Sequence, residues 1–161
     1  PRSYRQHRMV LFFTRGPLFY LEYNLRLLLY AIGSRVDAYS AVDLDSLGAM
    51  WLAATLRHKP LVYDAHEIFT EVPELQPGGR KQRLWKSIER FLLPKVRTGY
   101  TVNHSLAQWY ARQYGVQWSV VRNMPVARQA LPVLAGEFIL YQGALNAGRG
   151  LEALLEAAPH L

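Results

Sequence analysis

The sequence predicts an α/β fold in which parallel strands form a doubly wound sheet. Short apolar runs alternate with longer segments of helical periodicity, a pattern typical of β-α-β units whose strands pair in parallel. Polar residues gather directly after several of the apolar runs, where the functional sites of open α/β sheets form. Of 161 residues, 50% are hydrophobic and 19% are charged, so the chain has enough apolar material for a buried core.

The first part of the chain predicts strand, helix, strand and helix. Gly16 and Pro17 end a short apolar run, and the helix that follows is apolar around most of its circumference, as a well-buried helix would be. Asp45 or Ser46 is expected to cap the second helix, which Pro60 ends. The predicted elements are strand 9–14, helix 18–32, strand 36–42, an acidic loop 43–45 and helix 47–57.

The second part continues the alternation of strands and helices. An amphipathic pattern places Leu84, Ile88, Phe91 and Leu92 on one helix face. Gly115 is expected to stop the helix after that one. The predicted elements are strand 61–64, a proline- and glycine-rich loop 73–79, helix 81–93, strand 98–102, helix 105–114 and strand 118–121.

The composition changes after Asn123. Two prolines and the absence of a clear period indicate a linker, after which a new apolar run leads into a glycine-rich turn and a helix beginning at Leu151. The predicted organisation is a domain at residues 1–123, a linker at 124–136 and the start of a second domain at 137–161, whose first strand is residues 137–141.

The charge balance favours anionic partners. Lys and Arg number 19 against 12 Asp and Glu, which gives a formal net charge of +7 and a pI near 9.9. Nucleic acid, a phosphorylated substrate and an acidic membrane surface all fit that charge. The absence of cysteine excludes a disulfide framework, a thiolate metal site and a cysteine nucleophile. No apolar stretch reaches the roughly 18–20 residues that a membrane span requires.

Polar side chains follow two of the predicted strands. For Asp43 and Asp45, a helix cap, a polar contact with substrate and a divalent metal site all remain open. Asp64, His66 and Glu67 place three titratable groups in one loop. His66 is suited to proton transfer or to hydrogen bonding with a sugar hydroxyl, and the alternative is an ordinary loop histidine.

The glycine-rich turn at residues 143–150 is a candidate anion site. Backbone N–H groups at a helix start favour anions, and the guanidinium of Arg149 suits a phosphate. The turn has neither a Walker nor a G-x-G-x-x-G pattern, so a plain strand–turn–helix junction is the alternative.

Helix 81–93 and its flanks are strongly basic. With Trp85, these cations suit an anionic membrane surface, while a solvated helix face is the alternative. No known nucleic-acid-binding signature accompanies them, so nucleic acid is not the expected partner. The basic residues, opposed only by Glu89, are Arg80, Lys81, Arg83, Lys86, Arg90, Lys95 and Arg97.

Several short motifs occur in a fixed order along nearly the whole chain. They are PRSYRQ at 1–6, VDAYSAVDLD at 36–45, LVYDAHEIF at 61–69, IER at 88–90, YTVN at 100–103, VVRN at 120–123 followed by Pro125, and YQGAL with RGLE between 141 and 152. Together they closely resemble the amino-terminal domain of family 4 retaining glycosyltransferases, with the start of the carboxy-terminal domain. The ordered series is far more specific than any one motif.

This resemblance implies the GT-B fold, in which two Rossmann-like domains face each other across a cleft. It implies a hexosyltransferase-type reaction that moves a sugar from a nucleotide-sugar donor to an acceptor hydroxyl with retention, in glycan or polysaccharide biosynthesis, and without a cofactor or an obligatory metal. The acceptor is expected to be a sugar or a lipid-linked molecule. The expected location is cytoplasmic, and binding of the basic helix would place the protein at the inner face of the membrane.

The resemblance also assigns roles to residues by position. His66 matches the active-site histidine of the family, and Ala144 stands where a second basic residue is common. The residues expected on the acceptor side are Asp43, Asp64, Glu67 and Asn123. The residues expected to bind the donor diphosphate are Gly143, Arg149 and Gly150.

The chain also departs from the family pattern. The family's first strand is missing before Pro1 and most of the donor domain is missing after Leu161, so we expect an incomplete transferase that is inactive alone. One alternative is a non-enzymatic basic α/β module that binds nucleic acid or an anionic membrane surface. Another is a metal-dependent transfer through Asp43 and Asp45.

Overall fold

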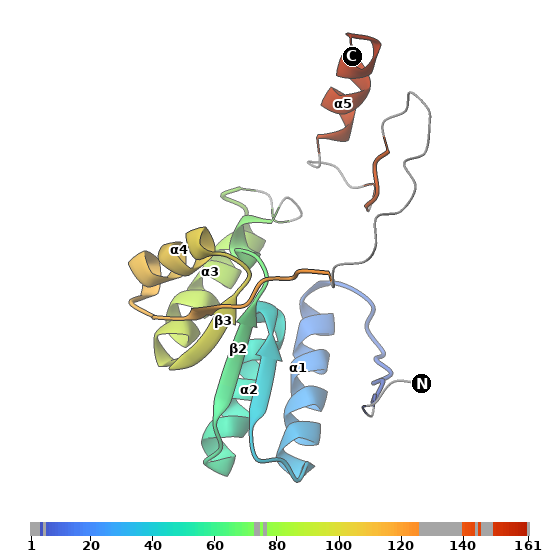
Figure 1. Cartoon of the computed structure of the whole chain (residues 1–161). Helices are drawn as coiled ribbons and strands as arrows, with labels where there is room; N and C mark the ends of the chain where they lie inside the picture. The colour runs from blue at the N-terminus through green and yellow to red at the C-terminus, as the bar shows by residue number, and fades with distance from the viewer. Residues whose placement is uncertain are drawn as a thin grey trace.

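The computed structural model shows an α/β fold with a parallel sheet (Figure 1). It describes residues 4, 6–72, 75, 77–125, 140–143, 145 and 150–160. Within these residues four strands pair in the order β1-β2-β3-β4: β1 (Tyr39–Val42), β2 (Leu61–Ala65), β3 (Thr98–Thr101) and β4 (Ser119–Val120). The helices are α1 (Gly16–Gly33), α2 (Asp43–Arg57), α3 (Arg80–Leu92), α4 (His104–Tyr114) and α5 (Leu151–Ala157), with short 3-10 turns at Phe69–Glu71, Leu93–Lys95 and Ala158–His160.

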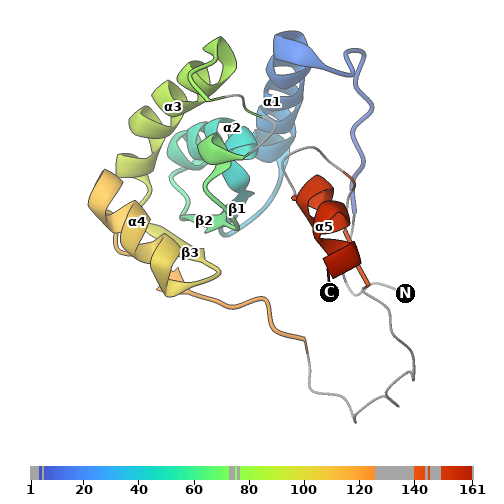
Figure 2. The ribbon, with the colours of Figure 1, turned by 90° about the horizontal axis from the view of Figure 1, so that it is seen from above.

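The core lies between the sheet and its helices. Parallel register brings Ala41 beside Tyr63 and Tyr63 beside Gly99, so these residues face the same side of the sheet. Helices α1, α2 and α3 lie on one side of the sheet (Figure 2), and α4 adds the buried Tyr110 to the same core. The parallel α/β arrangement predicted from the alternating pattern is therefore confirmed.

Gly99 lets the Trp118 ring approach the sheet closely. A methyl group at this position would lie 2.9 Å from the indole. We expect Gly99→Ala to destabilise the domain by about 1–3 kcal/mol, because either the strand or the buried Trp118 ring would have to shift to admit the methyl group. Chemical denaturation measures this change. Gly48→Ala is the matched control, since its methyl group meets nothing closer than 3.7 Å; a helix-interior alanine should stabilise by about 0.5–1 kcal/mol. Equal effects of both substitutions would contradict the packing argument.

Helix α1 is present as predicted, but the expectation that it is well buried is wrong. Its buried residues are Leu27 and Ala31, and Ala31 belongs to one apolar cluster with Ala53 and Ala54 of α2. The two helices are also joined by Asn24, whose side chain donates to the Asp45 carbonyl (2.9 Å) and accepts from the Ala49 N–H (3.3 Å). One face of α1 therefore packs against α2. The exposed leucines of α1 are Leu18, Leu21, Leu25 and Leu29.

The strand predicted at residues 9–14 does not form. Its backbone N–H groups at Phe12 and Phe13 donate to the Glu22 carboxylate, at 2.9 and 3.0 Å, and not to a neighbouring strand. Arg26 holds that carboxylate from the next turn of α1 at 2.8 Å. A side chain of α1 thus satisfies the donors that a sheet would otherwise have paired.

The buried face of α3 also differs from the predicted one. Leu92 is buried, but Leu84 and Phe91 are exposed, and two polar residues, Gln82 and Glu89, take their place inside. The inner face meets hydrogen-bonding groups of neighbouring elements, so polar side chains can be satisfied there. The amphipathic pattern gave the right helix and half of its inner face, since Leu92 is buried and Ile88 packs against the core, while Leu84 and Phe91 point outward.

The other boundaries lie close to those predicted. Gly115 ends α4 with φ +68, a left-handed conformation that glycine adopts without strain. The last helix begins at Leu151. Residues 137–139 of the predicted strand and residues 126–136 of the predicted linker lie outside the described residues, and Leu140 and Tyr141 are not in a strand. In the described part of the chain, no helix combines the length and apolar character needed to cross a membrane.

Candidate active site

The acidic pair lies in the first turn of α2, not in a loop. Asp43 follows β1 directly and has φ +57, a left-handed conformation that aspartate tolerates better than most residues. This conformation turns the strand straight into the helix, so Val42 is the N-cap and neither Asp45 nor Ser46 caps the helix as predicted. The Ser46 hydroxyl donates to the Val42 carbonyl (2.7 Å).

His66 is held by residues that lie at or just after the carboxyl ends of different strands. The ring atom Nε2 lies 3.1 Å from Asp64 Oδ2, and Nδ1 lies 3.3 Å from the amide nitrogen of Asn123. The backbone N–H of His66 donates to Asp43 Oδ1 at 3.4 Å. These residues come from the ends of β1, β2 and β4, and because the strands are parallel the ends lie at one edge of the sheet.

The contacts of the ring fit the Nε2–H tautomer of His66. The Asn123 amide donates to Nδ1, so this nitrogen is an acceptor, and Nε2–H donates to the Asp64 carboxylate. The His66 side chain is 39% exposed. It is therefore oriented by the protein and still open to a bound molecule.

Tyr100 belongs to this cluster, although the sequence analysis did not single it out. Its hydroxyl donates to Asp64 Oδ2 at 2.8 Å, the same oxygen that contacts His66. The sequence carries no direct signal of this contact, because it depends on the register that places Tyr100 beside Asp64 in neighbouring parallel strands. The hydrogen bond to Asp64 raises the pKa of the Tyr100 hydroxyl, with smaller contributions from burial and from the charge of Asp64.

Burial sets the electrostatics of the acidic pair. It raises the pKa of Asp43, and the nearby Asp64 carboxylate adds to this, while the backbone N–H and the charge of His66 act in the opposite direction. Burial also raises the pKa of Asp45, with the Asp43 charge as the second cause. Both carboxyl groups therefore bind a proton more readily than a free aspartate side chain does.

The structure brings together four of the predicted site residues: Asp43, Asp64, His66 and Asn123. The Glu67 side chain is exposed and makes no hydrogen bond to this cluster. The backbone carbonyl of Glu67 accepts a hydrogen bond from the Tyr110 hydroxyl (2.9 Å). Gly150 has φ +71 and is the N-cap of α5, and Gly143 packs against the Tyr141 hydroxyl. Arg149 lies outside the described residues.

Among the described residues, no group of three or more His, Asp and Glu side chains is arranged to hold a metal ion. A parallel sheet with helices packed against it is typical of a Rossmann-like domain, and such domains bind their ligands at the carboxyl ends of the strands, where the oriented His66 lies. The sequence model of a family described as Glycosyltransferase Family 4 matches residues 1–125. The chain therefore belongs to glycosyltransferase family 4. Glycosyltransferases transfer a sugar from a donor to an acceptor. A search of curated proteins found no match.

Proposed function

We propose that this domain forms the acceptor side of a glycosyltransferase that moves a sugar from a nucleotide-sugar to a hydroxyl group, with retention, in glycan or polysaccharide biosynthesis. The observation that supports this most is the His66 ring, oriented by Asp64 and Asn123 and partly exposed. The family match supports a transferase and gives no support to a non-enzymatic module.

The cluster can supply hydrogen bonding and charge at a reacting sugar. An incoming hydroxyl that replaces the Asn123 amide would donate to His66 Nδ1, while the Asp64 carboxylate holds Nε2–H and stabilises positive charge on the ring. Asp43 anchors the histidine backbone and presents a second acceptor from the end of β1. We assign the remaining acceptor-side contact to the exposed Glu67.

We assign the donor diphosphate to the turn that precedes α5. Gly143 and Gly150 offer backbone N–H groups, and Arg149 supplies the guanidinium. The proposal requires no metal ion, since the backbone groups and Arg149 would neutralise the diphosphate.

A transfer assay on the full-length protein that contains this domain tests this proposal. Nucleotide-sugars are supplied with simple sugar and lipid-linked acceptors, and NMR of the product gives the anomeric configuration. The expected result is transfer with the configuration of the donor, at a rate that a chelator does not change. Inverted product would remove the retention, and loss of activity in chelator restored by Mn²⁺ would favour metal-dependent chemistry.

A second proposal concerns the exposed face of α3, which suits the anionic cytoplasmic face of a membrane. Leu84 and Phe91 are exposed on it, and the Lys95 ammonium lies 3.1 Å from the Phe91 ring centre. Glu89 is buried, so it does not offset the positive charge there. The exposed cations on and beside this helix are Arg80, Lys81, Arg83, Arg90, Lys95 and Arg97.

Removing two of these charges should weaken membrane binding. Each basic residue near an acidic bilayer contributes about 1 kcal/mol, so we expect Arg83→Gln with Arg90→Gln to lower partitioning about 30-fold. Sedimentation with vesicles containing phosphatidylserine measures the change. Arg35→Gln with Arg112→Gln removes the same charge from exposed sites outside α3 and should change partitioning much less. Equal losses in both pairs would mean that net charge alone, not this helix face, governs binding.

A further inference from the structure

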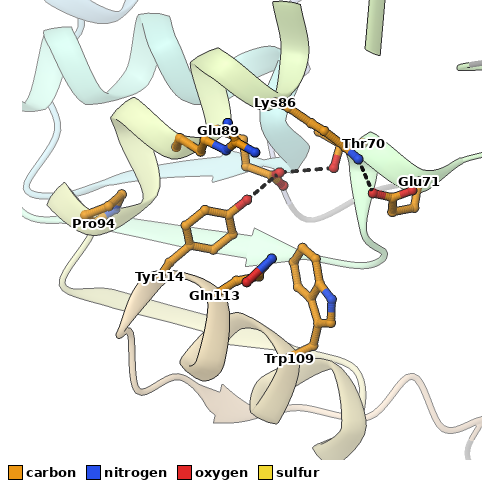
Figure 3. A pocket seen from close by; sticks show the side chains of 9 residues that line it. Thr70, Glu71, Lys86, Glu89, Pro94, Trp109, Gln113 and Tyr114 are labelled. Carbon is orange, nitrogen blue, oxygen red and sulfur yellow. Dashed lines mark hydrogen bonds and ion pairs between the residues drawn. The ribbon is translucent and has the colours of Figure 1, made fainter. Parts of the chain in front are cut away.

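Glu89 is a carboxyl group buried inside the domain. It is 1% exposed, and its Oε2 accepts hydrogen bonds from Thr70 Oγ1 (3.0 Å) and the Tyr114 hydroxyl (2.7 Å) (Figure 3). Within the described residues no ion pair reaches it, because the nearby Lys86 pairs with Glu71 at 2.7 Å. Its other oxygen, Oε1, is buried and has no hydrogen-bond partner in the part of the chain that the structure describes.

Such a group is expensive to bury. Burial raises the pKa of Glu89, against the opposing effect of the two hydroxyl donors. Apolar side chains of similar size would fill the same space without an unsatisfied oxygen, so stability alone is a weak explanation for Glu89. The residues that Glu89 contacts therefore indicate what it fixes.

One of its two partners lies on the loop that carries His66. Thr70 is fully buried and follows His66 in the short stretch that leaves β2. Its hydroxyl donates to Glu89, and its carbonyl accepts from the buried Gln82 side chain at 2.8 Å. Helix α3 thus holds Thr70 from both its side chain and its backbone.

The loop is held less firmly at His66 itself. The backbone hydrogen bond to Asp43 is long, at 3.4 Å, and Asn123 is an exposed partner. The buried anchors lie further along, where Tyr110 holds the Glu67 carbonyl and Glu89 holds Thr70. The direction in which the loop leaves the sheet is therefore set from α3 and α4.

We propose that Glu89 is a positioning residue for His66, acting through Thr70 to hold the imidazole against Asp64. The relevance of Glu89 to catalysis rests on the proposed function. Its effect on the orientation of the His66 ring does not depend on that function. The competing explanation is that Glu89 only braces α3 against α4 through Tyr114. The two hydrogen bonds of Oε2 separate these explanations, because each can be removed without the other.

The test compares Thr70→Val with Tyr114→Phe in the intact protein, since each substitution removes one hydroxyl and keeps nearly the same shape. The imidazole nitrogen shifts of His66, assigned with His66→Gln, report its tautomer. We expect Thr70→Val to shift these resonances towards a mixture of tautomers, and Tyr114→Phe to leave them unchanged. Glu89→Gln keeps an acceptor oxygen and should resemble the native protein, while Glu89→Leu should resemble Thr70→Val.

Activity gives the second readout. We expect Thr70→Val to lower kcat about tenfold with the donor KM unchanged, as for a misplaced catalytic group. An unchanged His66 signal in folded Thr70→Val, or an equal change in Tyr114→Phe, would overturn the positioning role. If the His66 signal shifts and sugar transfer does not fall, the positioning role stands and the catalytic role of His66 fails. Circular dichroism confirms the fold of each variant.

Discussion

His66→Ala is expected to lower kcat for sugar transfer about a thousandfold. Removing the imidazole removes the group that is oriented by Asp64 and Asn123 and open to the reacting sugar, and a positioned acid–base or hydrogen-bonding side chain typically contributes 10²–10⁴-fold. The donor KM should change little, because the expected diphosphate contacts lie in the turn before α5. Initial rates over a series of donor concentrations measure both constants.

The control for this substitution is His104→Ala. His104 is an exposed histidine at the start of α4, with no contact to the cluster among the described residues. It should leave the rate within about twofold of native, as is usual for exposed surface sites. If His66→Ala keeps a tenth or more of the native rate, His66 does not act at the reacting sugar.

Asp64→Asn should lower kcat about a hundredfold while leaving the domain folded. The amide keeps the shape of the carboxylate but removes the negative charge that holds Nε2–H of His66 and stabilises charge on its ring. It also weakens the acceptor used by the Tyr100 hydroxyl. Steady-state kinetics measure the loss, and thermal unfolding checks that the sheet is intact.

Two controls limit the interpretation of Asp64→Asn. Tyr100→Phe removes one hydrogen bond from the same carboxylate and keeps its charge, so we expect a loss of only a few-fold. Asp37→Asn removes a carboxylate that is fully exposed and should change nothing. If Tyr100→Phe is as damaging as Asp64→Asn, the role of Asp64 is to fix the sheet edge and not to support the histidine.

Much of the fold followed from local patterns in the sequence. The order of strands and helices, the stop of α4 at Gly115 and the start of α5 at Leu151 all depend on periodicity and on residues that favour turns, which act over a few positions. The grouping of Asp64, His66 and Asn123 was predictable too, because the carboxyl ends of parallel strands must meet at one edge.

The errors of prediction concern what each element packs against. Residues 9–14 look like a strand until Glu22, on the following helix, takes the backbone donors at Phe12 and Phe13. The leucines of α1 look buried, yet only one stripe of that helix meets α2. The apolar character of a side chain indicates that its burial would be favourable. It does not indicate which element of the fold will pack against it.

The sequence by itself determined the α/β class, the family motifs and the candidate histidine, since these depend on the chain's own order of residues. Only the tertiary structure decided that Glu89 and Gln82 face inward, that Tyr100 joins Asp64, and that Asp43 turns β1 directly into α2. Each of these outcomes depends on a partner distant in the chain, and a polar group can be buried only where such a partner satisfies it.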